Sequence, residues 1–163
     1  MKHFTSYYAN FANIPKDYMC IGISRVCPDW FQGVNISNFS FYRNNVLAPS
    51  ESLLYGYKNG EITQEEYKKI YITDLITRVQ NELKQPDIPT WINVMDSFYE
   101  SECYTKWNGL VFMCYEKPSD FCHRHLFRRL LNNIYNIQCD EYGCKPFEVW
   151  GYKPEHQPSK ELF

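Results

Sequence analysis

Two thiols, a carboxylate, an imidazole and a guanidinium lie within one short stretch of the chain. They are Cys114, Glu116, Cys122, His123 and Arg124. A thiol becomes more nucleophilic when cationic neighbours or a helix N-terminus lower its pKa. An imidazole or a carboxyl can transfer protons, and a guanidinium can bind phosphate through two hydrogen bonds. The stretch therefore has the parts of a site for nucleophilic or acid–base chemistry on an anionic ligand.

The pattern on either side predicts where this stretch lies in the fold. Residues 110–114 begin with four apolar side chains and are typical of a buried strand, and residues 120–133 have helical periodicity. In open α/β sheets, the turn that follows the carboxyl end of a strand is where ligands bind. The helix N-terminus there favours phosphate, carboxylate or thiolate. We therefore expect Cys114 at a strand end and Cys122 in the first turn of a helix.

Each of these residues has a structural interpretation that the sequence leaves open. Cys122 is interpreted as a nucleophile or as a buried cysteine under the turn, and Cys114 as its reversible disulfide partner or as core. His123 would serve as an acid–base group, hold the Glu116 carboxylate, or bond to a backbone carbonyl. We expect Arg124 to bind an anion. Because Arg124 begins a helix, its replacement is predicted to leave the fold intact.

A zinc site is a further interpretation of the same region. The potential ligands are Cys114, Cys122, His123, His125, Cys139 and Cys144. Structural zinc sites usually have two closely spaced pairs of ligands, and adjacent residues on a helix, such as Cys122 and His123, rarely bind one ion. We therefore predict no metal and no cofactor, and keep a structural zinc-binding domain as an alternative. Cys139 and Cys144 are expected to form a disulfide or to remain loop thiols.

Strands and helices are predicted to alternate along the chain. Strands are expected at 2–8, 18–24, 110–114 and 147–150, and helices near 49–60, from 63 to about 85, at 94–106 and at 120–133. Thr63 and Glu66 form a capping box for the second helix. This alternation favours an α/β fold: a single domain over 1–152 with a mostly parallel sheet and helices on both faces. Residues 27–45 are expected to form a polar loop, and 153–163 a loose tail.

Other candidate ligand-binding residues lie near the remaining strand ends or on the first two helices. They are Thr5, Ser6, Arg25, Lys58, Tyr67 and Tyr71. The two tyrosines, one helical turn apart, offer a stacking surface, although such a pair is also typical of a core. Arg25, Lys58 and Arg124 would form a cationic pocket in a chain whose net charge is −2. We therefore expect a small anionic ligand, with a nucleotide as the leading class.

Composition argues against several other classes of protein. The negative net charge argues against a broad basic surface for duplex nucleic acid, although a pocket for a single flipped base stays open. No apolar run approaches the ~18 residues of a membrane span, so no membrane partner is expected. Seven cysteines without a signal-peptide pattern favour reduced thiols and a cytoplasmic location. Phosphate-loop, dinucleotide-binding and zinc-protease motifs do not occur in the sequence.

Several short segments carry a resemblance to a known family. They are Thr5-Ser6-Tyr7, Ile23-Ser24-Arg25, Tyr57-Lys58-Asn59-Gly60, Glu66-Tyr67 with Tyr71, and Cys114-Tyr-Glu-Lys-Pro followed by Cys122-His-Arg. In this order they resemble the bacterial and phage family known as domain of unknown function 488, over about residues 4–131. The cysteine–glutamate and cysteine–histidine–arginine element is the most specific part. The resemblance implies a compact α/β domain in which these segments converge, and it brings no established reaction.

From the residues and the resemblance together, we predict a cytoplasmic bacterial or phage protein with an anion pocket built on the Cys114–Arg124 stretch. A thiol-dependent enzyme acting on a nucleotide or a nucleic-acid base is the first hypothesis. The alternatives are a phage protein that sequesters a nucleotide without changing it, and a structural zinc-binding domain.

Overall fold

The computed structural model describes residues 1–32, 36–41, 45–101 and 107–152. They form a sheet of five strands, all parallel, in the order β3-β2-β4-β1-β5. The strands are β1 (Lys2–Tyr7), β2 (Tyr18–Gly22), β3 (Phe39–Phe41), β4 (Gly109–Cys114) and β5 (Cys139–Glu141). The predicted α/β fold with a parallel sheet is confirmed. None of the helices in the described ranges is long and apolar enough to cross a lipid bilayer.

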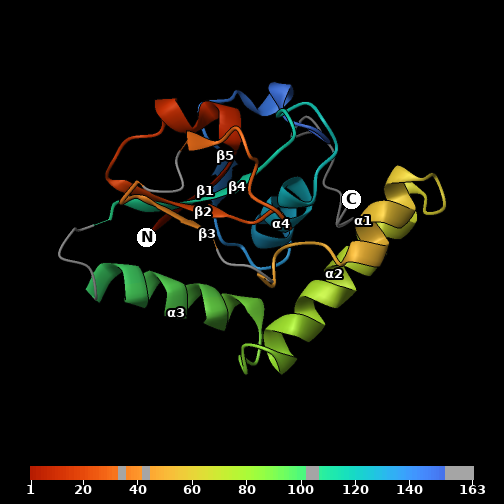
Figure 1. Cartoon of the computed structure of the whole chain (residues 1–163). Coiled ribbons are helices and arrows are strands. Elements are labelled where there is room, and N and C mark those ends of the chain that lie inside the picture. Colours follow the sequence, from red (N-terminus) through yellow and green to blue (C-terminus); the bar gives the residue numbers. More distant parts are fainter. Residues whose placement is uncertain (33–35, 42–44, 102–106, 153–163) are drawn as a thin grey trace.

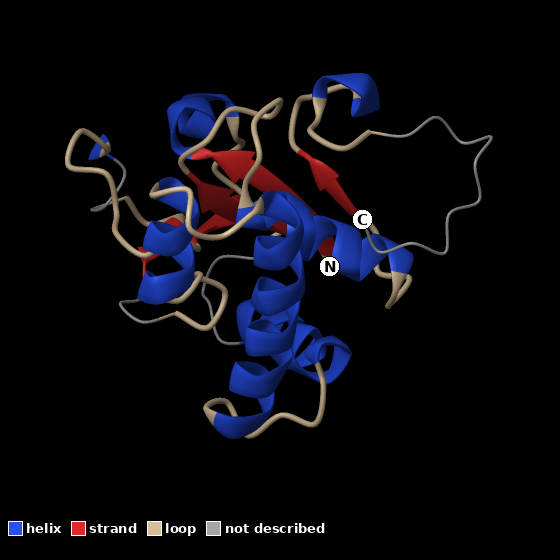
Figure 2. Cartoon of the chain, turned by 90° about the vertical axis from the view of Figure 1, so that its right-hand side faces the viewer, coloured by secondary structure: helices blue, strands red, loops and turns tan. Residues whose placement is uncertain are grey.

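The two faces of the sheet are covered differently. The α-helices are α1 (Glu51–Lys58), α2 (Gln64–Asn81), α3 (Ile88–Ser101) and α4 (His123–Asn133), and their apolar residues form one core with one face of the sheet. The 3₁₀ helix η1 (Tyr8–Asn13) lies over the other face (Figure 1). Helix α2 runs away from the sheet, and its far end meets α3 (Figure 1, Figure 2).

Strand β4 shows why both faces must be covered. All six of its residues are buried. Because side chains alternate along a strand, Leu110, Phe112 and Cys114 join the core under the α-helices. Val111 and Met113 pack with the apolar residues on the other side. Cys114 therefore ends the central strand on the face that α4 covers.

Local sequence signals explain the two long helices at the edge of the domain. The predicted capping box of α2 is present: the Thr63 hydroxyl accepts from the Glu66 amide, and the Glu66 carboxylate accepts from the Thr63 amide. Helix α3 begins at Ile88, earlier than the predicted 94. The Asp87 carboxylate there accepts from the Thr90 amide at 2.8 Å, a typical cap. Residues 102–106 and the tail at 153–163 lie outside the described residues.

Two sequence predictions about strands were wrong. Residues 147–150 are not a strand, because Pro146 opens a short 3₁₀ helix, η3 (Pro146–Glu148). The last strand is instead β5, whose Cys139 makes two backbone hydrogen bonds with the Asn132 side chain of α4. The polar loop expected at 27–45 contains the short edge strand β3.

Candidate functional site

The candidate site lies where β4 passes into α4. Cys114 is the last residue of β4, and His123 is the first residue of α4. The sequence placed Cys122 in the first helical turn, but it is the N-cap residue, with extended φ and ψ of −153° and 145°. An extended residue points its side chain differently from a helical one. Cys122 and His123 therefore both face Cys114, although they are adjacent in the chain.

The sulfur and nitrogen atoms of this group lie close together. His123 Nδ1 is 3.8 Å from Cys114 Sγ and 3.8 Å from Cys122 Sγ. The Cys114 thiol also donates to the Glu116 carboxylate, with Sγ 3.5 Å from Oε2. Cys114, Cys122 and His123 are all buried. We call Cys114, Glu116, Cys122 and His123 the thiol–imidazole cluster.

The imidazole of His123 has a fixed orientation. Its Nε2 lies 3.0 Å from the backbone carbonyl of Ile23, just after β2. A carbonyl only accepts, so Nε2 carries a proton and donates it. Nδ1, the atom that faces the two sulfurs, therefore carries the lone pair when the ring is neutral and a second proton when the ring is charged. A hydrogen bond to a backbone carbonyl was one of the roles predicted for His123, as a purely structural contact. In the structure this bond also orients the ring so that Nδ1 faces the thiols.

The two cysteines of the cluster differ in the direction in which their surroundings shift the thiol pKa. Burial raises the pKa of Cys122, but the neighbouring Cys114 thiol and the positive charges of His123 and Arg124 hold that pKa well below the usual range. Burial and the neighbouring Cys122 raise the pKa of Cys114 well above its ordinary value. Burial and the negative charge of Cys122 raise the pKa of Glu116 to about 7. Cys122 is therefore the more acidic thiol, beside a carboxyl that titrates near neutral pH.

A cavity of about 310 Å³ opens beside the cluster. Cys114, Glu116 and His123 line it together with Arg25, which follows β2, and Lys58, which ends α1. These segments, which are distant in the sequence, were predicted to meet, and they do. The Arg25 guanidinium is partly exposed; it donates to the Pro49 carbonyl and lies 3.4 Å from the Glu51 carboxylate. We call this space the cluster cavity.

Arg124 lies apart from the residues that line the cluster cavity. Its side chain is completely buried, so the expectation that a helix-start residue lies outside the core is wrong. Its Nε and Nη2 donate to Glu141 Oε1 at 3.1 and 2.9 Å, and the Thr5 hydroxyl donates to Glu141 Oε2 at 2.6 Å. Glu141, which the sequence analysis did not name, thus neutralises Arg124. Asp140 and Glu141 are adjacent acidic residues, and the sequence does not show which of them is buried. The pairing of β5 with β1 places Glu141 inward and Asp140 outward.

The remaining ligand-binding candidates also lie away from the cavity lining. Ser6 accepts a hydrogen bond from the Asn10 amide at 3.1 Å. The Tyr71 hydroxyl donates to the Leu47 carbonyl at 2.8 Å, and the Tyr67 ring stacks on the Tyr71 ring with centroids 6.2 Å apart. Both tyrosines are buried, which agrees with the core interpretation that the sequence left open.

The other potential metal ligands are not part of the cluster. His125 is buried with its ring near Trp150, and burial and Arg124 lower its pKa to about 3. The six cysteines in the described ranges are all free thiols, so Cys139 and Cys144 do not form a disulfide. Cys139 lies in β5 rather than in a loop. Cys103 falls outside the described residues.

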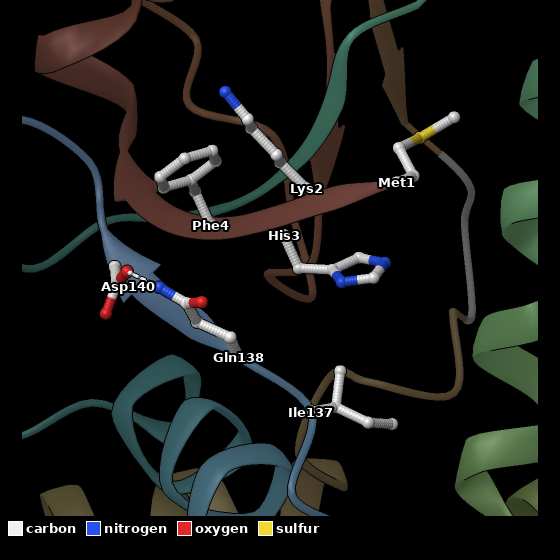
Figure 3. Close-up of a pocket in the computed structure, with 7 residues that line it drawn as sticks. All are labelled: Met1, Lys2, His3, Phe4, Ile137, Gln138 and Asp140. Carbon is white, nitrogen blue, oxygen red and sulfur yellow. Dashed lines mark hydrogen bonds between the residues drawn. The ribbon is translucent and has the colours of Figure 1, made fainter.

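A larger cavity, of about 460 Å³, lies near the start of β1 (Figure 3). Lys2, His3 and Phe4 of β1 line it with Gln138 and Asp140, which bond to each other at 3.0 Å. His3 Nε2 is hydrogen-bonded to Asp96 at 2.8 Å. No thiol among the described residues lines this cavity, and parallel strands carry their ligands at the opposite, carboxyl edge. We therefore assign the candidate site to the cluster cavity.

Comparison of the chain with protein-family models, with curated proteins and with solved structures finds no match. The resemblance to domain of unknown function 488 therefore stays a prediction.

Proposed function

We propose that the protein binds a small anionic ligand, a nucleotide, in the cluster cavity, and that the thiol–imidazole cluster acts on it chemically. The observation that carries the proposal is the lining of this one cavity. Arg25 and Lys58 supply positive charge at its wall, and Cys114, Glu116 and His123 supply thiol, carboxyl and imidazole groups. Its volume of about 310 Å³ is at the lower end of the usual range for small-molecule sites.

Exposed aromatic rings support a nucleotide over a simple inorganic anion. Tyr55 and Tyr115 line the same cavity, with 52% and 41% of their surfaces exposed. A base stacks favourably on such rings, while arginine and lysine bind the phosphate. The same features suit a single unstacked nucleic-acid base, so a mononucleotide and a short single strand are both probes of this site.

A second cationic group adjoins the cavity through Arg25. Arg25 and Arg78 line a neighbouring space of about 150 Å³. The Nη1 of Arg78 donates to the Ala48 carbonyl at 2.6 Å, but its buried Nη2 has no hydrogen-bond partner among the described residues. An unpaired buried donor is costly. An anion held by Arg25 would supply an acceptor close to this group.

The first candidate is a thiol-dependent enzyme, because Glu116 and His123 offer proton donors and acceptors next to the thiols. One observation favours a second candidate, a protein that holds a nucleotide without changing it. The side chains of Cys114 and Cys122 are only 2% and 4% exposed, which restricts attack on a bound molecule. The proposal places either protein in the cytoplasm of a bacterium or an infected cell, supported by the family resemblance and by the free described thiols.

Thermal unfolding with a panel of nucleotides, a short single strand and inorganic phosphate tests the proposal. A ligand at 100 times its Kd stabilises the folded state by about 2.7 kcal/mol. For a domain of this size, that corresponds to a Tm increase of roughly 5–10 °C. We expect the increase to disappear when Arg25→Ala and Lys58→Ala are combined. It should persist in Lys69→Ala, which removes an exposed lysine from the first half of α2.

The variants should fold normally, because partly exposed ion pairs such as Arg25–Glu51 contribute little to stability. The absence of stabilisation by every anion in the wild-type protein contradicts the proposal. Denaturing the complex and identifying the released ligand then separates the two candidates. An enzyme releases a changed molecule, and a sequestering protein releases it intact.

A further inference from the structure

Three potential metal-ligand atoms converge beside the cluster cavity: Cys114 Sγ, Cys122 Sγ and His123 Nδ1. They all lie within 4.8 Å of one another, and the three side chains are buried. Within the ranges that the structure describes, no other group of cysteine, histidine, aspartate and glutamate side chains meets this criterion. Two thiols and an imidazole are the ligand types that zinc prefers.

The distances fit a tetrahedral ion. Zinc bonds of about 2.3 Å to sulfur and about 2.0 Å to nitrogen place the two ligand atoms about 3.5 Å apart at the tetrahedral angle. Nδ1 of His123 is 3.8 Å from each sulfur. The single lone pair of Nδ1 accepts a proton from one thiol only. A shared metal ion, by contrast, would bind both sulfurs and Nδ1 at the same time.

The surroundings of His123 also suit a ligand. A histidine that binds zinc usually donates its other ring N–H to a carboxylate or a backbone carbonyl, which fixes the ring. His123 Nε2 donates to the Ile23 carbonyl at 3.0 Å, so Nδ1 is free to bind. The extended N-cap conformation of Cys122 removes the objection that adjacent helical residues rarely share an ion.

We propose that Cys114, Cys122 and His123 bind one Zn²⁺ ion, with the fourth coordination position open to the cluster cavity. Cys114 and His123 both line that cavity. Three protein ligands with one open position are typical of catalytic rather than structural zinc. Two thiolates balance the charge of Zn²⁺, so the buried site carries no uncompensated charge.

Glu116 lies next to this centre without being one of its ligands. Its carboxylate is 3.5 Å from Cys114 Sγ, but it does not belong to the group whose atoms all lie within 4.8 Å. It faces the same cavity as Arg25 and Lys58. The open position would hold a water molecule or an atom of the bound anion, with Glu116 as the neighbouring proton acceptor.

Metal titration of the full chain tests the inference. The protein is stripped with a chelator and titrated with Zn²⁺ against a chromogenic competitor, and with Co²⁺ as a spectroscopic substitute, with no nucleotide or phosphate present. We expect one equivalent of Zn²⁺ and a thiolate-to-cobalt charge-transfer band in the wild type. Cys144→Ser, which changes a half-buried cysteine outside the cluster, and Glu116→Gln should both keep one equivalent. Cys122→Ser and His123→Gln should lower the affinity at least tenfold.

Circular dichroism shows whether each variant is folded. The inference is overturned if the folded wild type takes up no Zn²⁺, or if a folded Cys122→Ser binds it as tightly as the wild type. If Glu116→Gln no longer binds the metal, Glu116 is the fourth ligand, and the proposal that the fourth coordination position is open is wrong. If a cluster variant does not fold, the Co²⁺ spectrum of the wild type shows whether thiolates bind the metal. Thiolate ligands produce a charge-transfer band and other ligands do not, so a spectrum without this band overturns the inference. Metal binding and anion binding are measured separately, so either proposal can fail alone.

Discussion

Replacement of Glu141 by glutamine should strongly destabilise the protein. The carboxylate accepts from Nε and Nη2 of Arg124 and from the Thr5 hydroxyl, and both ends of the ion pair are buried. Glutamine has the same shape but no charge, so it leaves the Arg124 guanidinium without the counter-charge to which it is hydrogen-bonded. Removing one partner of a buried pair costs about 3–5 kcal/mol. The total stability of a domain is about 5–15 kcal/mol, so this is a large part of it.

Urea unfolding measures the effect. With a slope of about 2 kcal/mol per M, the unfolding midpoint of Glu141→Gln should fall by roughly 2 M. Asp140→Asn is the matched control, because it makes the same chemical change at the preceding, exposed residue of β5. It should change stability by no more than about 0.5 kcal/mol. A double variant, Arg124→Met with Glu141→Leu, should recover much of the loss, since apolar side chains can replace a buried ion pair.

The reasoning is refuted if Glu141→Gln unfolds at the same urea concentration as Asp140→Asn. It is also refuted if Arg124→Ala is as stable as the wild type, because the buried Glu141 carboxylate would then tolerate losing its partner. The structure thus changes the expectation for Arg124→Ala from a loss of ligand binding to a loss of stability.

Three further substitutions have effects that urea or thermal unfolding can measure. Thr63→Ala removes the cap that bonds to the Glu66 amide and should cost about 1 kcal/mol; an unchanged Tm would show that the cap contributes nothing. Gly109→Ala places a Cβ atom 2.7 Å from the Tyr18 ring and 2.9 Å from the Lys2 carbonyl oxygen and should cost about 1–3 kcal/mol; a neutral effect would show that this close approach of strands and ring is not rigid. Tyr71→Phe leaves a backbone carbonyl without its buried donor and should cost about 1–3 kcal/mol, unless an internal water replaces the hydroxyl.

Strong local patterns were enough to predict the elements that position the site. The apolar run of β4 and the capping box of α2 each have a direct physical cause within a few residues. Because β4 and α4 were both predicted, the loop between them was placed at the carboxyl edge of the sheet. Cys114, Glu116 and His123 do meet there, at one wall of the cluster cavity.

Short elements and distant partners could not be predicted in the same way. Strand β5 has three residues, two of them acidic, which have low strand propensity. Its position depends on contacts with α4, made through Asn132 and through the pairing of Arg124 with Glu141. The carbonyl that orients His123 belongs to Ile23, and a backbone group leaves no signal in residue type.

The order of the strands has a consequence for synthesis on the ribosome. Strand β4 lies between β1 and β2, yet about a hundred residues precede it in the chain. Both partners of β1, β4 and β5, are made after α3, so β1 leaves the ribosome with two unpaired edges. Unpaired edges and exposed apolar residues make a nascent chain prone to aggregation. We therefore expect β1 and β2 to join one sheet only after residues 109–114 emerge and pair with both.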